Sequence, residues 1–178
     1  YDPPTGLANR NRFHERLDEA LHLSKRDGSP IGLLFLELDK FKTINDSFGH
    51  PVGDELLKYV AEKLLDATRE TDTVARLGGD EFAVIMTLLD REERAATAAE
   101  RIVECLSETV TMSGCLIKSG TSIGISLSPH DSTDAEELIR ISDKALYVAK
   151  DRGRGNYQFF DDKMDQESQR AAKCPRVY

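Results

Sequence analysis

The segment that most constrains the fold of this chain is a continuous apolar run, Ile31–Leu38 (IGLLFLEL), with turn-forming residues on both sides. A strand with one face in water alternates apolar and polar residues, so an unbroken apolar run is typical of a strand buried on both faces. Such a strand needs a packed layer above and below it. The sequence therefore predicts a sheet that is covered on both faces and has this strand in its interior.

Two shorter strands, Thr73–Leu77 and Phe82–Leu88, are separated only by Gly78, Gly79, Asp80 and Glu81. Paired glycines accept the positive φ angles of tight turns, so we expect a hairpin here. The predicted helices are about Asn9–Lys25, Asp54–Thr68, Asp90–Glu108 and Asp134–Lys150, with a short helical stretch and loop between Asp39 and Asp54. The remaining predicted strands are a second hairpin over Val110–Leu127, ending in TSIGISL, and an edge strand at Tyr157–Phe160. This alternation predicts a mixed α/β sandwich.

Composition narrows the possible functions. The 178 residues suit one domain, and a formal net charge of −8 argues against broad binding to nucleic acid or to an anionic membrane, since both need a basic surface. No apolar run is long enough to cross a bilayer, so we expect a cytoplasmic domain. A membrane anchor in another region of the parent protein is compatible with this expectation. Three cysteines, Cys105, Cys115 and Cys174, show no C-x-x-C spacing and are expected to be reduced thiols.

Acidic residues gather where the predicted strands end. Glu37 and Asp39 close the central strand, and Asp80 and Glu81 lie at the tip of the first hairpin. If these strands are neighbours, the carboxylates converge, and such clusters are tolerated mainly when a cation lies between them. Hard oxygen ligands favour Mg²⁺ or Mn²⁺. The alternative is that the acids are merely solvated. A P-loop is excluded, because the chain contains no G-x-x-x-x-G-K-[ST] sequence.

The string RLGGDEF is accompanied by further motifs in a fixed order: DPPTGLANRNRF, LELDKFKTINDSFGHPVGDELL, TSIGIS and ALYVAKDRGRGNY. Together they cover about residues 2–160 and resemble the GGDEF family, the diguanylate cyclases. The resemblance implies a GGDEF domain over residues 1–160, followed by a linker or added tail over residues 161–178. It also implies an α+β fold of the nucleotidyl-cyclase, palm-like kind, with a central mixed, largely antiparallel five-stranded sheet flanked by helices and an extra hairpin.

The family's site residues carry over by position. Glu37, Asp80 and Glu81 resemble its metal-binding acids, assisted by the backbone carbonyl of Leu38, and the resemblance implies two divalent metal ions, Mg²⁺ or Mn²⁺, as cofactor. Asp80 also resembles the family's proposed general base, and the residues implied for catalysis are Asp80, Glu81 and Lys42. The positions that resemble substrate-binding residues are Lys42, Lys150 and Arg154 for the phosphates, Gly78 and Gly79 in the turn, and Asn45 and Asp54 for guanine.

Guanine recognition by Asp54 also has a chemical reason. Guanine presents adjacent N1–H and N2–H donors, and one carboxylate accepts from both. The alternative is that Asp54 caps the N-terminus of a helix, since it precedes an apolar-periodic segment. A second site is implied by RETD, Arg69 to Asp72, which resembles the family's inhibitory R-x-x-D site for product. Arg101, in AERI, matches a further arginine of that site.

Two functions follow from the resemblance. The first is a diguanylate cyclase that condenses two GTP into cyclic di-GMP and pyrophosphate in a homodimer, with product inhibition. The second is a catalytically weak domain that binds GTP or cyclic di-GMP and regulates a neighbour. The second is favoured by Glu37, which replaces the family's aspartate and places the carboxylate one methylene farther from the strand; Pro4 also replaces a usual leucine. The segment YQFFDDKMDQESQR resembles a junction to an EAL phosphodiesterase domain, and neighbouring sensory domains are also expected.

Overall fold

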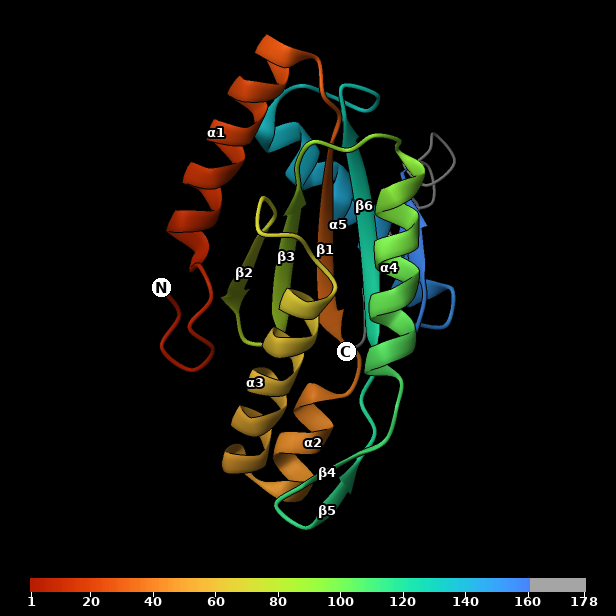
Figure 1. The fold of residues 1–178 in the computed structure, drawn as a ribbon. Helices are drawn as coiled ribbons and strands as arrows, with labels where there is room; N and C mark the ends of the chain where they lie inside the picture. Colours follow the sequence, from red (N-terminus) through yellow and green to blue (C-terminus); the bar gives the residue numbers. More distant parts are fainter. Residues whose placement is uncertain (161–178) are drawn as a thin grey trace.

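The computed structural model of the chain describes residues 1–160 and contains one five-stranded sheet (Figure 1). The strand order is β2 (Thr73–Gly78), β3 (Glu81–Met86), β1 (Ile31–Leu38), β6 (Thr121–Ser128) and β7 (Tyr157–Phe159). All neighbours are antiparallel except β6 and β7, which are parallel. The predicted fold class, a mixed and largely antiparallel sheet with β1 at its centre, is confirmed. The predicted tail over residues 161–178 lies outside the described residues.

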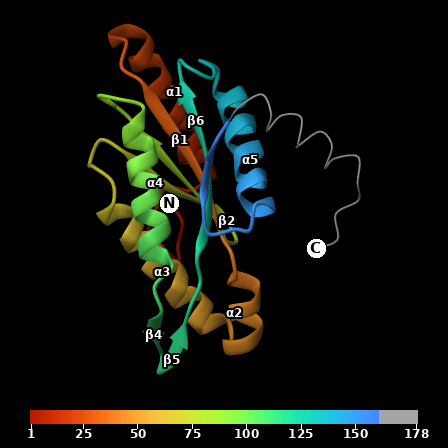
Figure 2. The same cartoon turned by 90° about the vertical axis from the view of Figure 1, so that its right-hand side faces the viewer.

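The sheet is covered on both faces, as the apolar run in β1 requires. Figure 2 shows α4 (Glu93–Leu106) and α5 (Ala135–Asp151) on opposite sides of the strands. Leu33 and Phe35 pack in the core cluster that includes α1 (Arg10–Asp27) and part of α5. Leu34 and Leu36 pack in the larger cluster formed with α3 (His50–Asp66) and α4. Successive β1 side chains therefore alternate between two apolar cores, so the strand carries no polar face until Glu37.

Capping residues mark the ends of two helices. Asn9 caps α1, its side chain accepting from the Arg12 amide at 2.9 Å, and Gly28 ends that helix at φ +78°. Asp134 caps α5 by accepting from the Glu137 amide at 3.1 Å. Both helices lie where the sequence places them, within a few residues.

The start predicted for the next helix is wrong by four residues, because α3 begins at His50 and not at Asp54. Gly49, at φ +91°, ends α2 (Phe41–Phe48) and precedes α3, and Pro51 lies in the first turn, where proline's fixed φ suits a helix. Asp54 therefore lies inside the helix, and the alternative that it is an N-cap is wrong.

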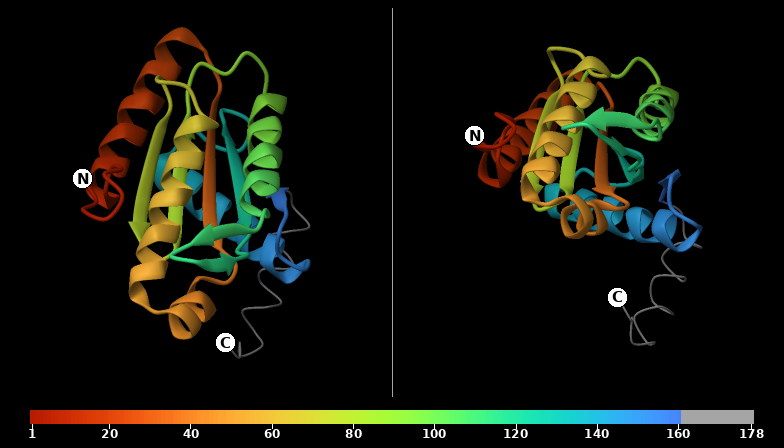
Figure 3. Two further views of the ribbon diagram at one scale, coloured as in Figure 1. Left: turned by 60° about the horizontal axis from the view of Figure 1, so that its bottom comes forward. Right: turned by 90° about the horizontal axis from the view of Figure 1, so that it is seen from below.

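The second predicted hairpin is shorter than expected. Only β4 (Val110–Met112) and β5 (Cys115–Ile117) pair with each other, and β6 joins the main sheet between β1 and β7. Figure 3 shows the β4–β5 hairpin beyond the sheet, at the end where α2 lies, and a hydrogen bond from Ser113 to Glu55 ties it to α3. Cys105 and Cys115 are free and half-buried, as predicted for reduced thiols, whereas Cys174 lies outside the described residues. Within residues 1–160 no helix combines the length and apolarity needed to cross a membrane.

Candidate active site

The acidic cluster forms because β1 and β3 are antiparallel neighbours. Glu37, near the end of β1, lies directly opposite Glu81, the first residue of β3. The Leu38 amide donates to the Asp80 carbonyl at 3.1 Å, which fixes the hairpin tip against the end of β1. The strand pairing on which the predicted convergence of Glu37, Asp80 and Glu81 depends is thus present.

The hairpin tip is held from a second direction by the start of the chain. Gly79 adopts φ +49°, a conformation that suits glycine, and its carbonyl accepts two hydrogen bonds from the Arg76 guanidinium, at 2.9 and 3.1 Å. The same guanidinium donates to Asp2 Oδ1 at 3.0 Å, and the Thr5 hydroxyl donates to Asp2 Oδ2 at 2.6 Å. Asp2 and Arg76 are each only 13% exposed. These two positioning residues were missed, because nothing in the sequence pairs DPPT with the arginine of RLGGDEF.

The electrostatics of the hairpin tip disfavour its negative charge. Burial raises the pKa of Asp80, and the nearby carboxylate of Glu37 raises it further, against the opposing effects of Lys150 and Arg154. Burial also raises the pKa of Glu81, followed by repulsion from Glu37 and Asp80. A nearby positive charge would therefore stabilise the ionised form of both Asp80 and Glu81.

Two basic side chains already lie beside these acids. Lys150 Nζ is 2.9 Å from Glu37 Oε2, and both side chains are largely buried, at 17% and 22% exposure. Arg10 Nη2 lies 3.8 Å from Glu81 Oε2 in a more exposed position. Among residues 1–160, no three acidic, histidine or cysteine side chains are arranged as a ready-made cation site. In this conformation the Glu37 carboxylate is paired with the Lys150 ammonium group.

The expectation that Asp39 joins the cluster is wrong. Its Oδ1 accepts a hydrogen bond from the Ser122 hydroxyl at 2.6 Å, and its Oδ2 accepts from the Gly155 amide at 3.1 Å. Arg154 Nη1 lies 3.9 Å from Asp39 Oδ1, and the aspartate side chain is only 6% exposed. Asp39 therefore ties the end of β1 to β6 and to the turn after α5, and both of its oxygens have partners outside the acidic cluster.

The predicted phosphate-binding residues lie on two elements that border the acids. Lys42 is exposed in the first turn of α2, which begins two residues after Asp39. This helix has no side-chain cap and no acidic residue in its first turn, so its N-terminal amides face solvent rather than a carboxylate. Lys150 lies in the last turn of α5, and Arg154, at φ +63°, lies in the turn that follows the helix.

The predicted guanine-binding residues meet where α2 packs on α3. Asn45 lies on α2, and its Oδ1 is a buried acceptor without a hydrogen-bond partner among the described residues. It is directed at Gly53 of α3, where an added Cβ would lie 1.7 Å from that oxygen. Asp54, the next residue, is exposed. Of these two residues Asp54 offers the exposed acceptor oxygens, and a carboxylate suits a ligand that presents two adjacent N–H donors.

The R-x-x-D residues form a structural anchor at the far end of β3. The Asp72 carboxylate accepts from the Arg69 amide at 2.9 Å and from the Thr87 amide at 3.1 Å. The Arg69 guanidinium donates to the carbonyls of Thr87 and Leu88, at 2.8 and 3.4 Å. Arg101 is exposed on α4. The turn before β2 is thus fastened to the end of β3, and Arg69 and Asp72 already have partners.

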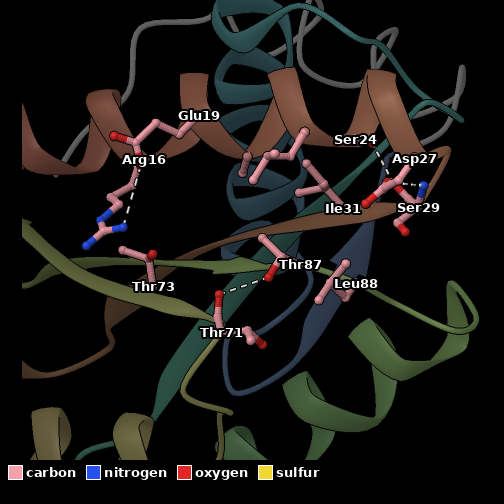
Figure 4. Close-up of a pocket in the computed structure, with 12 residues that line it drawn as sticks. Arg16, Glu19, Ser24, Asp27, Ser29, Ile31, Thr71, Thr73, Thr87 and Leu88 are labelled. Carbon is pink, nitrogen blue, oxygen red and sulfur yellow. Dashed lines mark hydrogen bonds and ion pairs between the residues drawn. The ribbon is translucent and has the colours of Figure 1, made fainter.

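A cavity of about 260 Å³ lies between α1 and this anchor, at the opposite end of β1 from Glu37 (Figure 4). Ile31 contributes to its wall, and Thr87, whose hydroxyl donates to the Thr71 carbonyl at 2.8 Å, closes one side next to Leu88. None of the predicted site residues lines it. The predicted site lies at the other end of β1, with the start of β3, the start of α2 and the end of α5, and Glu81 lines a separate cavity there together with Arg10.

Sequence comparison places this surface in a family. Residues 1–156 match the family described as diguanylate cyclase, GGDEF domain. The chain is 40% identical over 169 residues to the bifunctional diguanylate cyclase/cyclic di-GMP phosphodiesterase MucR of Pseudomonas aeruginosa, covering 95% of this chain and 24% of that protein. It is 37% identical to the diguanylate cyclase DosC of Escherichia coli, covering 89% of this chain and 35% of DosC. The chain spans 20–24% of the length of MucR and the next two curated relatives.

Solved structures show the same fold. A GGDEF-only structure of TpbB (YfiN) from Pseudomonas aeruginosa aligns with a TM-score of 0.92 at 34% identity, covering 95% of this chain and 99% of that one. The active GGEEF domain of a diguanylate cyclase from Vibrio cholerae aligns with a TM-score of 0.81 at 30% identity, covering 87% and 98%.

Fold and site together define a nucleotidyl-cyclase type of domain, with acidic residues at a hairpin tip and basic residues on the elements around it. The chain belongs to the GGDEF family of diguanylate cyclase domains. The family's divalent cation fits the residues present: the donors are carboxylate and carbonyl oxygens, and Asp80 and Glu81 carry pKa values raised by burial and mutual repulsion. The residues that would hold it are Glu37, Asp80, Glu81 and the Leu38 carbonyl.

Proposed function

We propose that this domain is a diguanylate cyclase, which condenses two GTP into cyclic di-GMP and releases pyrophosphate. The observation that carries the proposal is the register of β1 and β3, in which Glu37 lies opposite Glu81, the residue after Asp80. The basic side chain of Lys150, near the end of α5, contacts Glu37. The names of DosC and of the Vibrio cholerae domain support the same activity.

Guanine is the base that the α2–α3 contact suits. The exposed Asp54 carboxylate accepts from two adjacent N–H groups, and Asn45 contacts Gly53, the residue before it. Guanine supplies such donors at N1 and N2, whereas adenine has an acceptor at N1. Binding of ATP would place a lone pair against Asp54, which costs affinity.

The triphosphate would lie between α2 and the end of α5. Lys42 and the N-terminal amides of α2 neutralise charge from one side, and Lys150 and Arg154 from the other. Bound Mg²⁺ or Mn²⁺ would neutralise the phosphates further and favour ionisation of the attacking 3′-hydroxyl. Glu37, Asp80 and Glu81 would hold the two cations, and Asp80 would also accept the proton of the hydroxyl.

One domain offers one such site, and the product requires two GTP molecules. We therefore propose that catalysis takes place in a homodimer whose two sites face each other. Product would bind at Arg69, Asp72 and Arg101 and inhibit turnover. Because the name of MucR combines cyclase and phosphodiesterase activities, we further propose that sensory and EAL domains accompany this domain in a longer protein.

The test is GTP turnover by the domain fused to a constitutive dimeriser, in Mg²⁺ and separately in Mn²⁺, with cyclic di-GMP measured by chromatography. We expect product from the parent chain and none from Glu81→Gln. The matched control is Glu62→Gln, which removes the same charge from an exposed position on α3. Equal turnover by Glu81→Gln would contradict the proposed role of the hairpin acids.

A second function is favoured by one residue. Glu37 stands where the family resemblance places an aspartate, and in this structure it is bound by Lys150. A domain with this substitution that binds GTP without turnover would be a nucleotide-sensing module. GTP binding by calorimetry, with no cyclic di-GMP from the dimerised protein in either metal, would establish this alternative and exclude the cyclase.

A further inference from the structure

Two basic side chains at and just beyond the end of α5 form ion pairs with carboxylates at the end of β1. Lys150 Nζ lies 2.9 Å from Glu37 Oε2, and Arg154 Nη1 lies 3.9 Å from Asp39 Oδ1. Under the proposed function, Lys150 and Arg154 contact phosphates, and Glu37 binds a divalent cation. Lys150 and Glu37 thus each have one partner inside the chain and a different partner in the substrate complex.

The two ion pairs are not equivalent. Arg154 is 46% exposed and lies 3.9 Å from Asp39, too far for a hydrogen bond. Both oxygens of Asp39 already accept hydrogen bonds, from Ser122 and Gly155, so this ion pair contributes little to stability. Lys150 and Glu37 are 17% and 22% exposed and at hydrogen-bonding distance. A charge-assisted hydrogen bond shielded from water is a strong competitor for any other ligand of Glu37.

We propose that Lys150 is an internal competitor for the cation site: it occupies Glu37 in the nucleotide-free protein and transfers to the phosphates when nucleotide and divalent cation bind together. The proposal rests on the proposed function and adds to it the regulation of the same site. Since nucleotide draws Lys150 away from Glu37, and occupation of Glu37 by a cation releases Lys150, each ligand strengthens binding of the other. The nucleotide-free domain is therefore a weak binder of free divalent cations.

The length of Glu37 makes this competition possible. Its carboxylate reaches from β1 across to the last turn of α5, where Lys150 meets it. An aspartate at this position would retract the carboxylate by about 1.5 Å, one C–C bond, and lengthen the present 2.9 Å contact beyond hydrogen-bonding range. The glutamate thus supplies both a cation ligand and the contact that keeps that ligand occupied.

The test is a titration with Mn²⁺, followed by electron paramagnetic resonance of the free ion, with and without saturating α,β-methylene-GTP, which is not turned over. The main variant is Lys150→Gln. The matched control is Arg152→Gln, which removes the same charge two residues farther on, from an exposed side chain bonded to Gln158 at 3.0 Å. Thermal unfolding of each variant checks that it is folded.

We expect Lys150→Gln to tighten nucleotide-free Mn²⁺ binding by about tenfold, within the usual range of coupling between sites, and to reduce by a similar factor the tightening that nucleotide causes. Arg152→Gln should leave both quantities within about twofold, because an exposed charge is screened by salt. Glu37→Asp is the second variant and should also weaken the coupling. Adding Lys150→Gln to it should produce little further loss, since both changes remove one contact.

Unchanged or weaker nucleotide-free Mn²⁺ binding in Lys150→Gln would overturn the competition. Absence of Mn²⁺ binding from every variant, with nucleotide present, would overturn both the competition and the cyclase. Mn²⁺ binding with the expected coupling but no cyclic di-GMP from the dimerised protein would support the competition and reject only the cyclase.

Discussion

An alanine at Gly124 is expected to separate α5 from the sheet. Gly124 lies in β6, opposite Phe35 of β1, and α5 crosses directly over it. A Cβ at this position would lie 2.1 Å from the Ser142 carbonyl oxygen and 2.2 Å from the Leu146 nitrogen, both backbone atoms that cannot rotate away. Ordinary contact begins at 3.4 Å, so the helix and the strand must separate by 3.4 − 2.1 = 1.3 Å.

Such a displacement affects both stability and the site. Overpacking costs about 1–3 kcal/mol, and because backbone meets backbone we expect a value of about 3 kcal/mol. For a chain of this size that lowers the melting temperature by about 6–12 °C. Because α5 carries Lys150, binding of GTP should weaken as well, and turnover should fall by about 10²-fold, since errors of about 1 Å have that effect.

The assay is thermal unfolding followed by circular dichroism, with Gly32→Ala as the matched control. Gly32 also lies in an interior strand, but its added Cβ would meet only side-chain atoms, Ala95 Cβ at 3.3 Å and Leu89 Cδ1 at 3.4 Å. Gly32→Ala should melt within about 3 °C of the parent chain, as expected for a change below about 1 kcal/mol. If Gly124→Ala melted as high as Gly32→Ala, the argument that α5 depends on a bare strand backbone would be refuted.

Three further predictions concern the site and its supports. Gly53→Ala should expel the Asn45 side chain from the α2–α3 contact and weaken GTP binding by about tenfold, measured by calorimetry, because α2 and the predicted guanine-binding residues would be displaced relative to each other. Glu81→Gln should stabilise the protein at pH 7 by about 0.5 kcal/mol in thermal unfolding, a small value because the side chain is half exposed. Burial raises the pKa of Glu81, so the folded state holds its proton more tightly, stability falls as pH rises through that pKa, and the gain should vanish below about pH 4. Asp2→Ala should cost about 1.5–3 kcal/mol in the same measurement, because Arg76 would lose a charged partner in a largely buried position.

Each of these predictions has a result that contradicts it. Unchanged GTP affinity in Gly53→Ala would show that the α2–α3 contact does not support guanine binding. A stability gain from Glu81→Gln that persisted at pH 3.5 would mean that charge is not its cause. Asp2→Ala should be compared with Asp18→Ala, a change at an exposed position on α1, and equal melting temperatures would mean that the Asp2–Arg76 ion pair contributes nothing.

The sheet was predictable because its strongest signal is local. The apolar run in β1 has no polar face, and the structure shows why: its side chains alternate between two cores. The hairpin turn was predictable for the same reason, since Gly78 and Gly79 both adopt positive φ. The start of α3 was misjudged because Gly49 and Pro51 determine it, and because Val52, one turn before Leu56 on the buried face, was not counted in the apolar pattern.

Contacts between distant segments were not predictable in this way. Asp39 follows the same strand as Glu37, and only the Ser122 hydroxyl and the Gly155 amide, from other elements, turn it away from the acidic cluster. The ion pair of Asp2 with Arg76 joins residues 74 positions apart. Strand patterns state which residues share a face, but they do not state which side chain another element will bind.

The anchor formed by Arg69 and Asp72 affects how R-x-x-D sequences are to be interpreted. Both residues bind backbone groups of Thr87 or Leu88 and so hold the last residues of β3 in place without any ligand. A domain that never meets cyclic di-GMP would still lose stability if this arginine were replaced. These contacts give the motif a structural role in this chain that is separate from any binding of product. An alanine scan of this site must separate loosened turns from lost inhibition, by measuring unfolding and product binding on the same variants.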